Sequence, residues 1–530
     1  MCTFKIKYEK MSAHTITTTA TMKNIPRACD AFFAVMDAQF LGLSYDDVLL
    51  IPRYSDVLPS EIDLRARISR NIMMNIPVVS SPMDNVTEED MAIVLAEEGG
   101  MGIIHKNLSP EAQAKAVRKV KHRIAAFVSS PICVRINQTV AEVMEVAARK
   151  KYPFRSYPVK DEDGKVVGIL SNREVEYCSD HSRKVSEIMV TNIISAQELD
   201  DVQMAYNVMK DKHIGILPKF NNCGDFLGIY TWTDAKRIVE KGSANYNLAP
   251  DGTLRVGAAV GVLNKNNDVT QRRVQLLSEA GVDLLVIDTS KGDSANVVAM
   301  VKFCKENYPH IDVVAGNIAT ADASRLLRDA GVSAVRVGVG PGSICTTRVI
   351  SGVGYPQLSA VYECARALRG SGVAVWADGG IRFSGDITKA LGAGADVVML
   401  GSILAATTES PGDVIELPGG KKWKLYRGMG SLGAMKAHQE SRDRYKQTGT
   451  AGDKLVPEGV EGNVLYKGDA AGVLYQMLGG LRSGMGNCGA GTISELQELA
   501  EFVRITPAGK TESHPGSGLV QFDGTTNYQG

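Results

Sequence analysis

Short apolar runs alternate with amphipathic stretches along most of the chain from about residue 76. Each run ends in Gly, Ser, Asp or Asn, and helix-like stretches such as 272–280 and 321–330 lie between the runs. Continuous apolar runs are typical of parallel strands buried on both faces, with helices forming the right-handed crossovers. We therefore predict an α/β fold, a (β/α)8 TIM barrel, from eight runs. They are 76–80, 101–105, 256–262, 283–288, 312–317, 334–340, 374–378 and 396–402.

The alternation is interrupted between about residues 125 and 245, where the sequence repeats itself. Pro158 and Pro218 begin similar segments 60 residues apart, and each segment contains a β-hairpin turn signal. After each hairpin, a hydroxyl residue precedes an acid by three positions, as Ser171/Glu174 and Thr231/Asp234. These residues could be plain helix caps, or the hydroxyl could bind a phosphate and the acid a ribose diol. A repeat of this length predicts two similar modules packed together.

The repeat resembles a tandem cystathionine-β-synthase-type (CBS) pair, which implies that purine nucleotides bind to it. The first copy carries Glu174 where such pairs usually carry Asp. We expect a regulatory insert at 125–245, with copies at about 125–185 and 186–245. The catalytic barrel would then comprise 41–124 and 246–530, and residues 1–40 would be a poorly ordered extension.

The charge balance and the cysteine content limit the classes of protein to which the chain can belong. The chain has 59 Lys and Arg against 59 Asp and Glu, so no nucleic-acid-binding or membrane-coating surface is predicted. The nine cysteines are odd in number and lack metal-ligand spacing, which argues against a disulfide framework and indicates a reducing compartment. No stretch is long and apolar enough to span a bilayer, and no signal peptide is recognisable. We expect a soluble, cytoplasmic protein.

A glycine-rich loop at 338–348 follows the sixth run and contains Cys345. Its glycines let the backbone approach a ligand or ion closely, although the GxGxxG spacing of dinucleotide-binding folds is absent. An isolated cysteine is more often a small buried apolar residue than a nucleophile. Hydroxyl neighbours and Arg348 nearby instead indicate an activated thiolate.

This loop, Gly342-Ser343-Ile344-Cys345-Thr346-Thr347-Arg348, resembles the catalytic loop of the IMP dehydrogenase and GMP reductase superfamily. The resemblance extends over nearly all of the chain beyond the first forty residues. It implies that Cys345 attacks C2 of IMP, that hydride passes to NAD, and that water hydrolyses the covalent thioimidate to XMP for guanine nucleotide biosynthesis. Further matching segments are 80–84, 288–294, 316–317, 378–380, 399–402 and 426–430.

The resemblance also implies the binding residues. Asp378 would accept the ribose hydroxyls of IMP, Asp288 would hold the ribose beside the nicotinamide of NAD, and the segment after it, 291–293, departs from the family's usual variants. For Gly379 and Gly380 the alternative is turn geometry alone. Expected substrate residues are Ser81, Met83, Ser343, Asp378, Gly379, Gly380, Gly401, Ser402, Tyr426, Arg427, Gly428, Met429, Gly430 and Glu458. Expected cofactor residues are Asp288, Ser290, Asn317, Gly338, Val339 and Gly340.

A charged segment at about 431–465 resembles the mobile flap of bacterial-type IMP dehydrogenases, with Arg444 and Tyr445 as its water-activating pair. Thr347 and Glu458 would form an auxiliary proton relay. The alternative for the segment is a solvated charged loop. GMP reductase, which deaminates GMP with NADPH, has a shorter counterpart without this pair. A non-catalytic, nucleotide-sensing barrel is a third alternative, against which the presence of Cys345, Thr347 and Arg444 argues.

The C-terminal segment Glu512, Ser513 and His514 resembles one that reaches a neighbouring subunit. There it would complete a K+ site with backbone carbonyls of Gly340, Gly342 and Cys345. The alternative is a tail without a ligand, either ordered or disordered. The resemblance implies a homotetramer, and a site shared in this way requires an oligomer.

Overall fold

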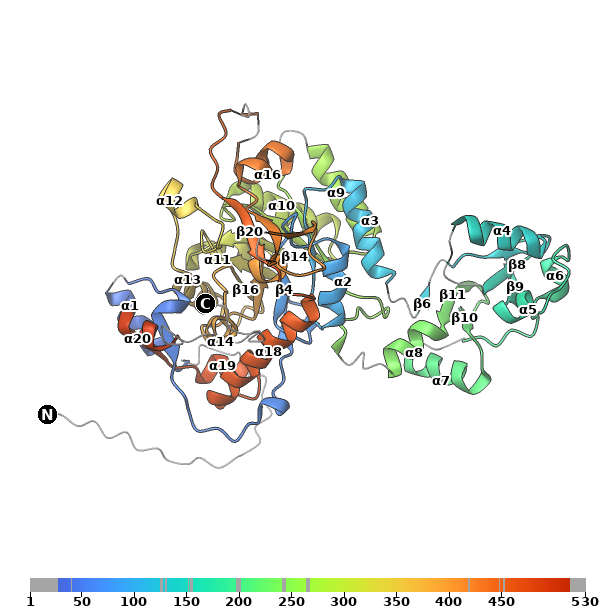
Figure 1. Ribbon diagram of the computed structural model, residues 1–530, viewed down its shortest axis with the longest axis horizontal. Helices are drawn as coiled ribbons and strands as arrows, with labels where there is room; N and C mark the ends of the chain where they lie inside the picture. Colours follow the sequence, from blue (N-terminus) through green and yellow to red (C-terminus); the bar gives the residue numbers. More distant parts are fainter. Residues whose placement is uncertain are drawn as a thin grey trace.

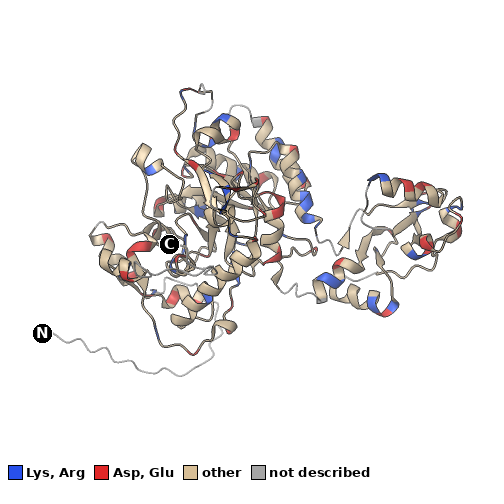
Figure 2. Ribbon diagram, viewed as in Figure 1, with Lys and Arg blue, Asp and Glu red and all other residues tan. Residues whose placement is uncertain are grey.

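The computed structural model describes residues 27–514 except 40, 124–126, 129–130, 151, 153–155, 197–201, 241–244, 264–266, 418–419, 448 and 451–452. Figure 1 shows a large barrel body, with the inserted residues forming a smaller body to one side of it. Among the described residues, no helix combines the length and apolar character that crossing a lipid bilayer requires. Lys and Arg are interspersed with Asp and Glu over both bodies (Figure 2).

Eight strands form one parallel sheet in the order β4-β17-β16-β15-β14-β13-β12-β5. A parallel bridge between Val79 and Met101 joins β4 to the chain just before β5, so the sheet comes round on itself. All eight predicted runs are therefore confirmed as barrel strands. Their bounds are β4 Val78–Ser80, β5 Ile103–Ile104, β12 Gly257–Val260, β13 Leu284–Asp288, β14 Asp312–Ile318, β15 Ala334–Val337, β16 Ala374–Asp378 and β17 Val397–Leu400.

The strands are buried on both faces, which explains why they appear in the sequence as uninterrupted apolar runs. β15 ends at Val337, earlier than the run, because Gly338 and Gly340 have φ values of +154° and +78° and turn the chain into the loop. The covering helices are α2 Glu89–Glu97, α3 Pro110–Lys121, α9 Asn267–Glu279, α10 Ala295–Asn307, α11 Ala321–Ala330, α13 Gln357–Leu368, α14 Ser384–Gly392, α18 Ala470–Asn487 and α19 Ile493–Leu499.

The N-terminal extension contains a helix that the sequence analysis did not predict, α1 (Asp30–Ala38). Phe33 and Met36, three residues apart on one face, are buried, and the Phe33 ring stacks on Tyr362 of α13 with centroids 3.8 Å apart. Arg369 donates to Asp30 over 2.7 Å. The expectation of poor order is therefore wrong for residues 27–39, because this short apolar patch finds a partner on the barrel. Residues 1–26 lie outside the described part.

The insert contains two three-stranded sheets, β7-β8-β9 and β10-β11-β6. Each sheet holds an antiparallel hairpin at a predicted turn, where Gly164 and Gly224 have φ values of +81° and +82°. The strands are β6 Phe127–Val128, β7 Val134–Arg135, β8 Tyr157–Lys160, β9 Val166–Leu170, β10 Ile216–Phe220 and β11 Phe226–Thr231. The helices are α4 Val140–Lys150, α5 Asn172–Glu176, α6 Val185–Ile188, α7 Val202–Lys212 and α8 Trp232–Glu240.

The remaining elements decorate the barrel. A three-stranded sheet, β18-β19-β20, brings the two ends of the flap region together. These strands are β18 Val414–Glu416, β19 Lys422–Arg427 and β20 Glu461–Leu465, with helices α16 Leu432–Ala437 and α17 Gln439–Arg444 between the last two. The others are η1 Tyr45–Asp47, β1 Val48–Leu50, η2 Pro59–Glu61, β2 Ala66–Arg67, β3 Met73–Met74, α12 Thr347–Ser351, α15 Ser402–Ala405, β21 Phe502–Arg504 and α20 Pro507–Glu512.

Candidate active site

A cavity of about 480 Å³ lies at the carboxyl ends of the barrel strands, the face where TIM barrels carry their chemistry. Most of the predicted site residues line it, although they come from loops far apart in the sequence. They are Ser81, Met83, Ser290, Asn317, Gly338, Val339, Gly340, Gly342, Ser343, Cys345, Thr347, Asp378, Gly379, Gly380, Gly401, Ser402, Tyr426, Gly428, Met429, Arg444, Tyr445 and Glu458.

A chain of hydrogen bonds connects the predicted nucleophile to a carboxylate. The Cys345 thiol donates to Thr347 Oγ1 over 3.2 Å, and the Thr347 hydroxyl donates to Glu458 Oε2 over 2.8 Å. Backbone pairing fixes this arrangement, because Thr346 N donates to the carbonyl of Glu458 and Val460 N to that of Ile344. The end of the flap segment is thus bonded directly to the cysteine loop.

Cys345 differs from the other cysteines in its surroundings. It is partly exposed and lines the cavity, whereas Cys29, Cys304 and Cys364 are fully buried. Burial raises the pKa of the Cys29 thiol to about 11 and that of Cys304 and Cys364 to about 12. These three thiols stay protonated at neutral pH, and Cys345 alone of the four has access to a ligand in the cavity.

A buried arginine connects the two carboxylates that the sequence analysis assigned to ribose binding. Arg336 on β15 donates from Nη1 to Asp288 Oδ1 over 2.5 Å and from Nε to Asp378 Oδ2 over 2.9 Å. Asn317 also donates to Asp378 Oδ2, over 2.7 Å. Arg336 was missed in the sequence analysis, although a charged residue inside an otherwise apolar barrel run is a signal that could have found it.

Arg444 reaches the same carboxylate from the flap. Its Nη1 forms an ion pair with Asp288 Oδ1, and its backbone carbonyl accepts a hydrogen bond of 2.8 Å from the Ser290 hydroxyl. Asp288 Oδ2 and Asn317 Oδ1 are buried and have no hydrogen-bond partner among the described residues. Asn317 lines the cavity, so its Oδ1 can accept from a ligand donor, whereas Asp288 Oδ2 can do so only when Arg444 moves away.

Two tyrosines form part of the cavity wall. Tyr445 packs on Gly430, where an added Cβ would lie 2.5 Å from Cζ of Tyr445, so only glycine fits. An added Cβ at Gly401 would lie 3.0 Å from the Tyr426 hydroxyl. Burial raises the pKa of both phenols, so both remain hydrogen-bond donors at neutral pH.

Tight glycine turns form another part of the cavity wall. Gly379 and Gly380 have φ values of +91° and +82°, and a Cβ at Gly379 would lie 2.8 Å from Cγ of Pro341. With Ser343 and Ser402 beside them, these turns present backbone N–H groups and short hydroxyls, the donors that suit a phosphate.

Several predicted residues do not line the cavity. The Arg427 guanidinium pairs with Asp84 over 2.7 Å. Gly430 contacts the cavity only through Tyr445, and the side chain of Asp288 lies behind Arg336 and Arg444. Glu512, Ser513 and His514 lie at the end of α20, where Lys510 pairs with Asp46 over 2.8 Å.

The comparisons with known proteins agree with this geometry. The model of the IMP dehydrogenase / GMP reductase domain matches residues 42–516. The chain belongs to the IMP dehydrogenase / GMP reductase family. It is 48% identical to an inosine-5′-monophosphate dehydrogenase of Aquifex aeolicus and 45% identical to one of Halalkalibacterium halodurans. Each match covers 89% of this chain and 95% of the relative.

A solved structure of the family also resembles the chain. It is a GMP reductase from Trypanosoma brucei in complex with guanosine 5′-monophosphate, 39% identical, with a TM-score of 0.77. The match covers 91% of this chain and 98% of that one. Both chemistries of the family therefore occur among its relatives, and the choice between them depends on the site.

Proposed function

We propose that this chain is an IMP dehydrogenase that oxidises IMP to XMP with NAD, in the biosynthesis of guanine nucleotides. The observation that carries the proposal is the meeting of Arg444 with the Cys345–Thr347–Glu458 chain in one cavity. Hydrolysis of the covalent thioimidate needs a base close to the attacking water, and the flap segment supplies candidate residues for that base. The relatives at 45–48% identity support the same activity.

Cys345 is the proposed nucleophile. Its sulfur bonds to C2 of the purine, which makes that carbon tetrahedral and able to release hydride. The glycine turns and serines would bind the phosphate, and Asp378, already held by Arg336 and Asn317, would orient the ribose. Because Arg336 and Asn317 already hold the Asp378 side chain, that side chain loses little conformational freedom when the substrate binds.

The residues present fit NAD. Asp288 Oδ2 and Asn317 Oδ1 are unmet buried acceptors, suited to a ribose hydroxyl and an amide N–H. NAD, when bound, accepts the hydride from C2. Because Arg444 pairs with Asp288 in this structure, its guanidinium and the cofactor ribose would compete for one carboxylate. We infer that the flap enters after the reduced cofactor leaves.

The closed flap then favours the second step. Water adds to C2 as its proton passes to a base, the C–S bond breaks, and XMP leaves while the Cys345 sulfur is released as a thiolate. Arg444 would take the proton of the water, helped by the neighbouring Tyr445. Thr347, bonded to Glu458 over 2.8 Å, supports the auxiliary relay.

GMP reductase is the second candidate because the Trypanosoma brucei structure is similar over nearly the whole chain. The test is absorbance at the NADH band with two mixtures, IMP plus NAD and GMP plus NADPH. We expect NADH to form in the first mixture and NADPH to be stable in the second. Consumption of NADPH with release of ammonia would reverse the assignment.

The insert is proposed to be a CBS pair that binds purine nucleotides and regulates the barrel. In the second copy, the Thr231 hydroxyl donates to Asp234 Oδ2 over 2.9 Å, and in the first Ser171 pairs with Glu174. Partial burial raises the pKa of Asp234, whose carboxyl group is bonded to the Thr231 hydroxyl.

Deleting residues 125–245 and joining the ends with a short Gly/Ser linker should leave turnover within about twofold. All eight barrel strands lie outside the insert. The deletion should also remove any response to ATP or GTP. Turnover with IMP and NAD, measured with and without each nucleotide, checks both expectations. A folded deletion protein without activity would show that the insert contributes to the active site.

Potassium is the proposed activating ion, and a homotetramer the proposed assembly. Carbonyl oxygens are suitable ligands for K+, and Gly340, Gly342 and Cys345 would supply theirs from one tight loop. Gly340 has a φ of +78°, a left-handed backbone conformation that glycine adopts readily and that allows this tight turn. Glu512, Ser513 and His514 of a neighbouring subunit would complete the cage, which requires the oligomer.

Replacing K+ by Na+ should lower turnover by about tenfold, because the smaller ion does not span a carbonyl cage built for K+. Truncation after Lys510 should give the same loss even in K+. Turnover in each chloride salt at constant ionic strength is the measurement, with light scattering reporting the oligomer. Equal rates in the two salts would contradict the site.

A further inference from the structure

The short helix that carries Arg444 has a second, independent contact with the barrel. On α17, Glu440 precedes Arg444 by four residues, so both side chains point from one face of the helix. Arg444 meets Asp288 of β13 at one end, and Glu440 Oε1 accepts a hydrogen bond of 2.8 Å from Arg273 of α9 at the other. The helix is therefore held at two points.

Arg273 is a rigid partner for this contact. Its side chain is only 3% exposed, and it donates from Nη1 to Gln113 over 2.7 Å and from Nη2 to the carbonyl of Leu108 over 3.0 Å. Gln113 in turn donates to the carbonyls of Ile104 and Ala259, at the ends of two barrel strands. The guanidinium is thus fixed before the flap arrives, so little entropy is lost when Glu440 binds it.

Glu440 also offsets positive charge near the position that Arg444 occupies beside Asp288. Lys106 is fully buried and donates from Nζ to the backbone carbonyl of Asp288 over 2.9 Å. Lys106 Nζ and Glu440 Oε2 both lie within 4.0 Å of the position that a Cβ at Gly261 would take. Burial, and then the Arg444 cation, lower the pKa of Lys106 to about 7, whereas Glu440 acts in the opposite direction. Glu440, together with Asp443, thus offsets the positive charge of Arg444 and Arg273 near Lys106.

We propose that Glu440 is a positioning residue for hydrolysis, whose ion pair with Arg273 determines how readily Arg444 displaces the cofactor from Asp288. The inference rests on the proposed role of Arg444 in activating water. It goes beyond that role because neither Glu440 nor Arg273 lines the cavity. The pair controls the flap equilibrium, not the chemistry.

The test is Glu440→Gln in the full-length protein, which keeps the size and removes the charge. We expect steady turnover to fall about tenfold, the lower range for losing a charge-assisted hydrogen bond, because Glu440 is a quarter exposed. The first burst of NADH should keep its rate and amplitude. The covalent adduct should accumulate. Because NAD and Arg444 would compete for Asp288, excess NAD should slow hydrolysis of the adduct, and this inhibition should begin at about tenfold lower NAD concentration in the variant than in the unchanged protein.

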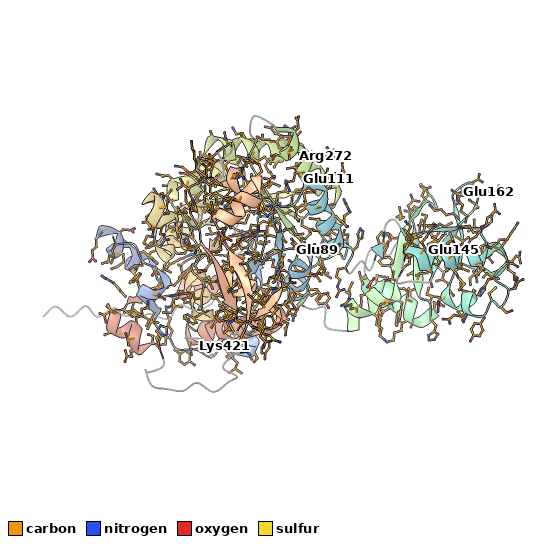
Figure 3. All side chains as sticks on the ribbon, turned by 45° about the horizontal axis from the view of Figure 1, so that its top comes forward. Glu89, Glu111, Glu145, Glu162, Arg272 and Lys421 are labelled. Carbon is orange, nitrogen blue, oxygen red and sulfur yellow. The ribbon has the colours of Figure 1, made fainter. Side chains whose placement is uncertain are left out.

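An exposed ion pair that shares helix α9 with this contact provides the matched control. Arg272 of α9 and Glu111 of α3 pair over 2.9 Å on the outside of the barrel, next to the buried Arg273 (Figure 3). Glu111→Gln removes an equivalent charge but should change neither the burst nor the inhibition by NAD, because exposed pairs contribute little. In an Arg273→Met background, the further effect of Glu440→Gln should shrink to less than about twofold.

The outcomes separate the inference from the function on which it rests. An unchanged adduct level and NAD inhibition in Glu440→Gln, or an undiminished effect in the Arg273→Met background, would overturn the positioning role. Loss of the burst would overturn it too, since the residue would then act before hydrolysis. If Arg444→Ala also fails to accumulate adduct, the proposed role of Arg444 fails with it. If only Glu440→Gln fails to do so, Arg444 keeps its role.

Discussion

Replacing Cys345 with alanine is expected to lower turnover by at least about a thousandfold while leaving IMP binding within about threefold. The sulfur is the atom that makes C2 of the purine tetrahedral, and no other described thiol lines the cavity. The phosphate turns and Asp378 are built by other strands, so the alanine variant keeps them. Turnover with IMP and NAD, together with IMP affinity by calorimetry, measures both effects.

The control for Cys345 is a thiol buried in the core. Cys304 lies in the core, where burial raises its pKa to about 12, and Cys304→Ala should keep turnover near that of the unchanged protein. An IMP analogue with a reactive C2 substituent should label Cys345 and spare Cys304. Normal turnover by the Cys345→Ala variant would remove the nucleophile from the proposed mechanism.

Replacing Arg444 with alanine is expected to separate the two halves of the reaction. Steady turnover should fall roughly 100- to 10,000-fold, the range for a missing general base. The first burst of NADH should remain, because hydride transfer does not use the water. The adduct on Cys345 should accumulate, since Thr347 and Glu458 alone form a slower relay. Stopped-flow absorbance and the mass of the acid-quenched protein measure burst and adduct.

A neighbouring arginine serves as the control for Arg444. Arg442 is on the same helix but donates to the carbonyls of Met435 and Lys436, away from Asp288. Arg442→Ala should therefore reduce turnover far less, and without accumulation of adduct. If the burst disappears in Arg444→Ala, Arg444 acts earlier, in binding or hydride transfer. Unchanged steady turnover would falsify the flap assignment.

The barrel and the catalytic loop could be predicted because their signals are local. A strand buried on both faces needs an uninterrupted apolar run, and all eight such runs became barrel strands. The turns that need a positive φ are marked by glycine, as at Gly340 and Gly379. Residues placed just after such runs must meet at one end of a parallel barrel, so most of the predicted site residues line one cavity.

Partners between distant segments could not be predicted in this way. The ion pairs of Asp288 with Arg336 and Arg444, for example, were not predicted. The apolar face of α1 was too short to predict a helix from the sequence. In the structure, this face packs on the barrel, where Phe33 stacks on the ring of Tyr362. In each case, a short local pattern is compatible with several environments, and packing selects one.

The fold class and the family could be predicted from the sequence alone, since they follow from periodicity and from contiguous motifs, and the same patterns led to the proposed insert and nucleophile. Which charged side chains lie together in the interior became visible only in the folded chain. Arg273 and Glu440 are 167 residues apart, and nothing near either residue indicates the other. Their pairing depends on closure of the barrel, which carries Arg273, and on the packing of the flap, which carries Glu440, against it. An ion pair has no sequence period, and its strength depends on the burial that the fold creates.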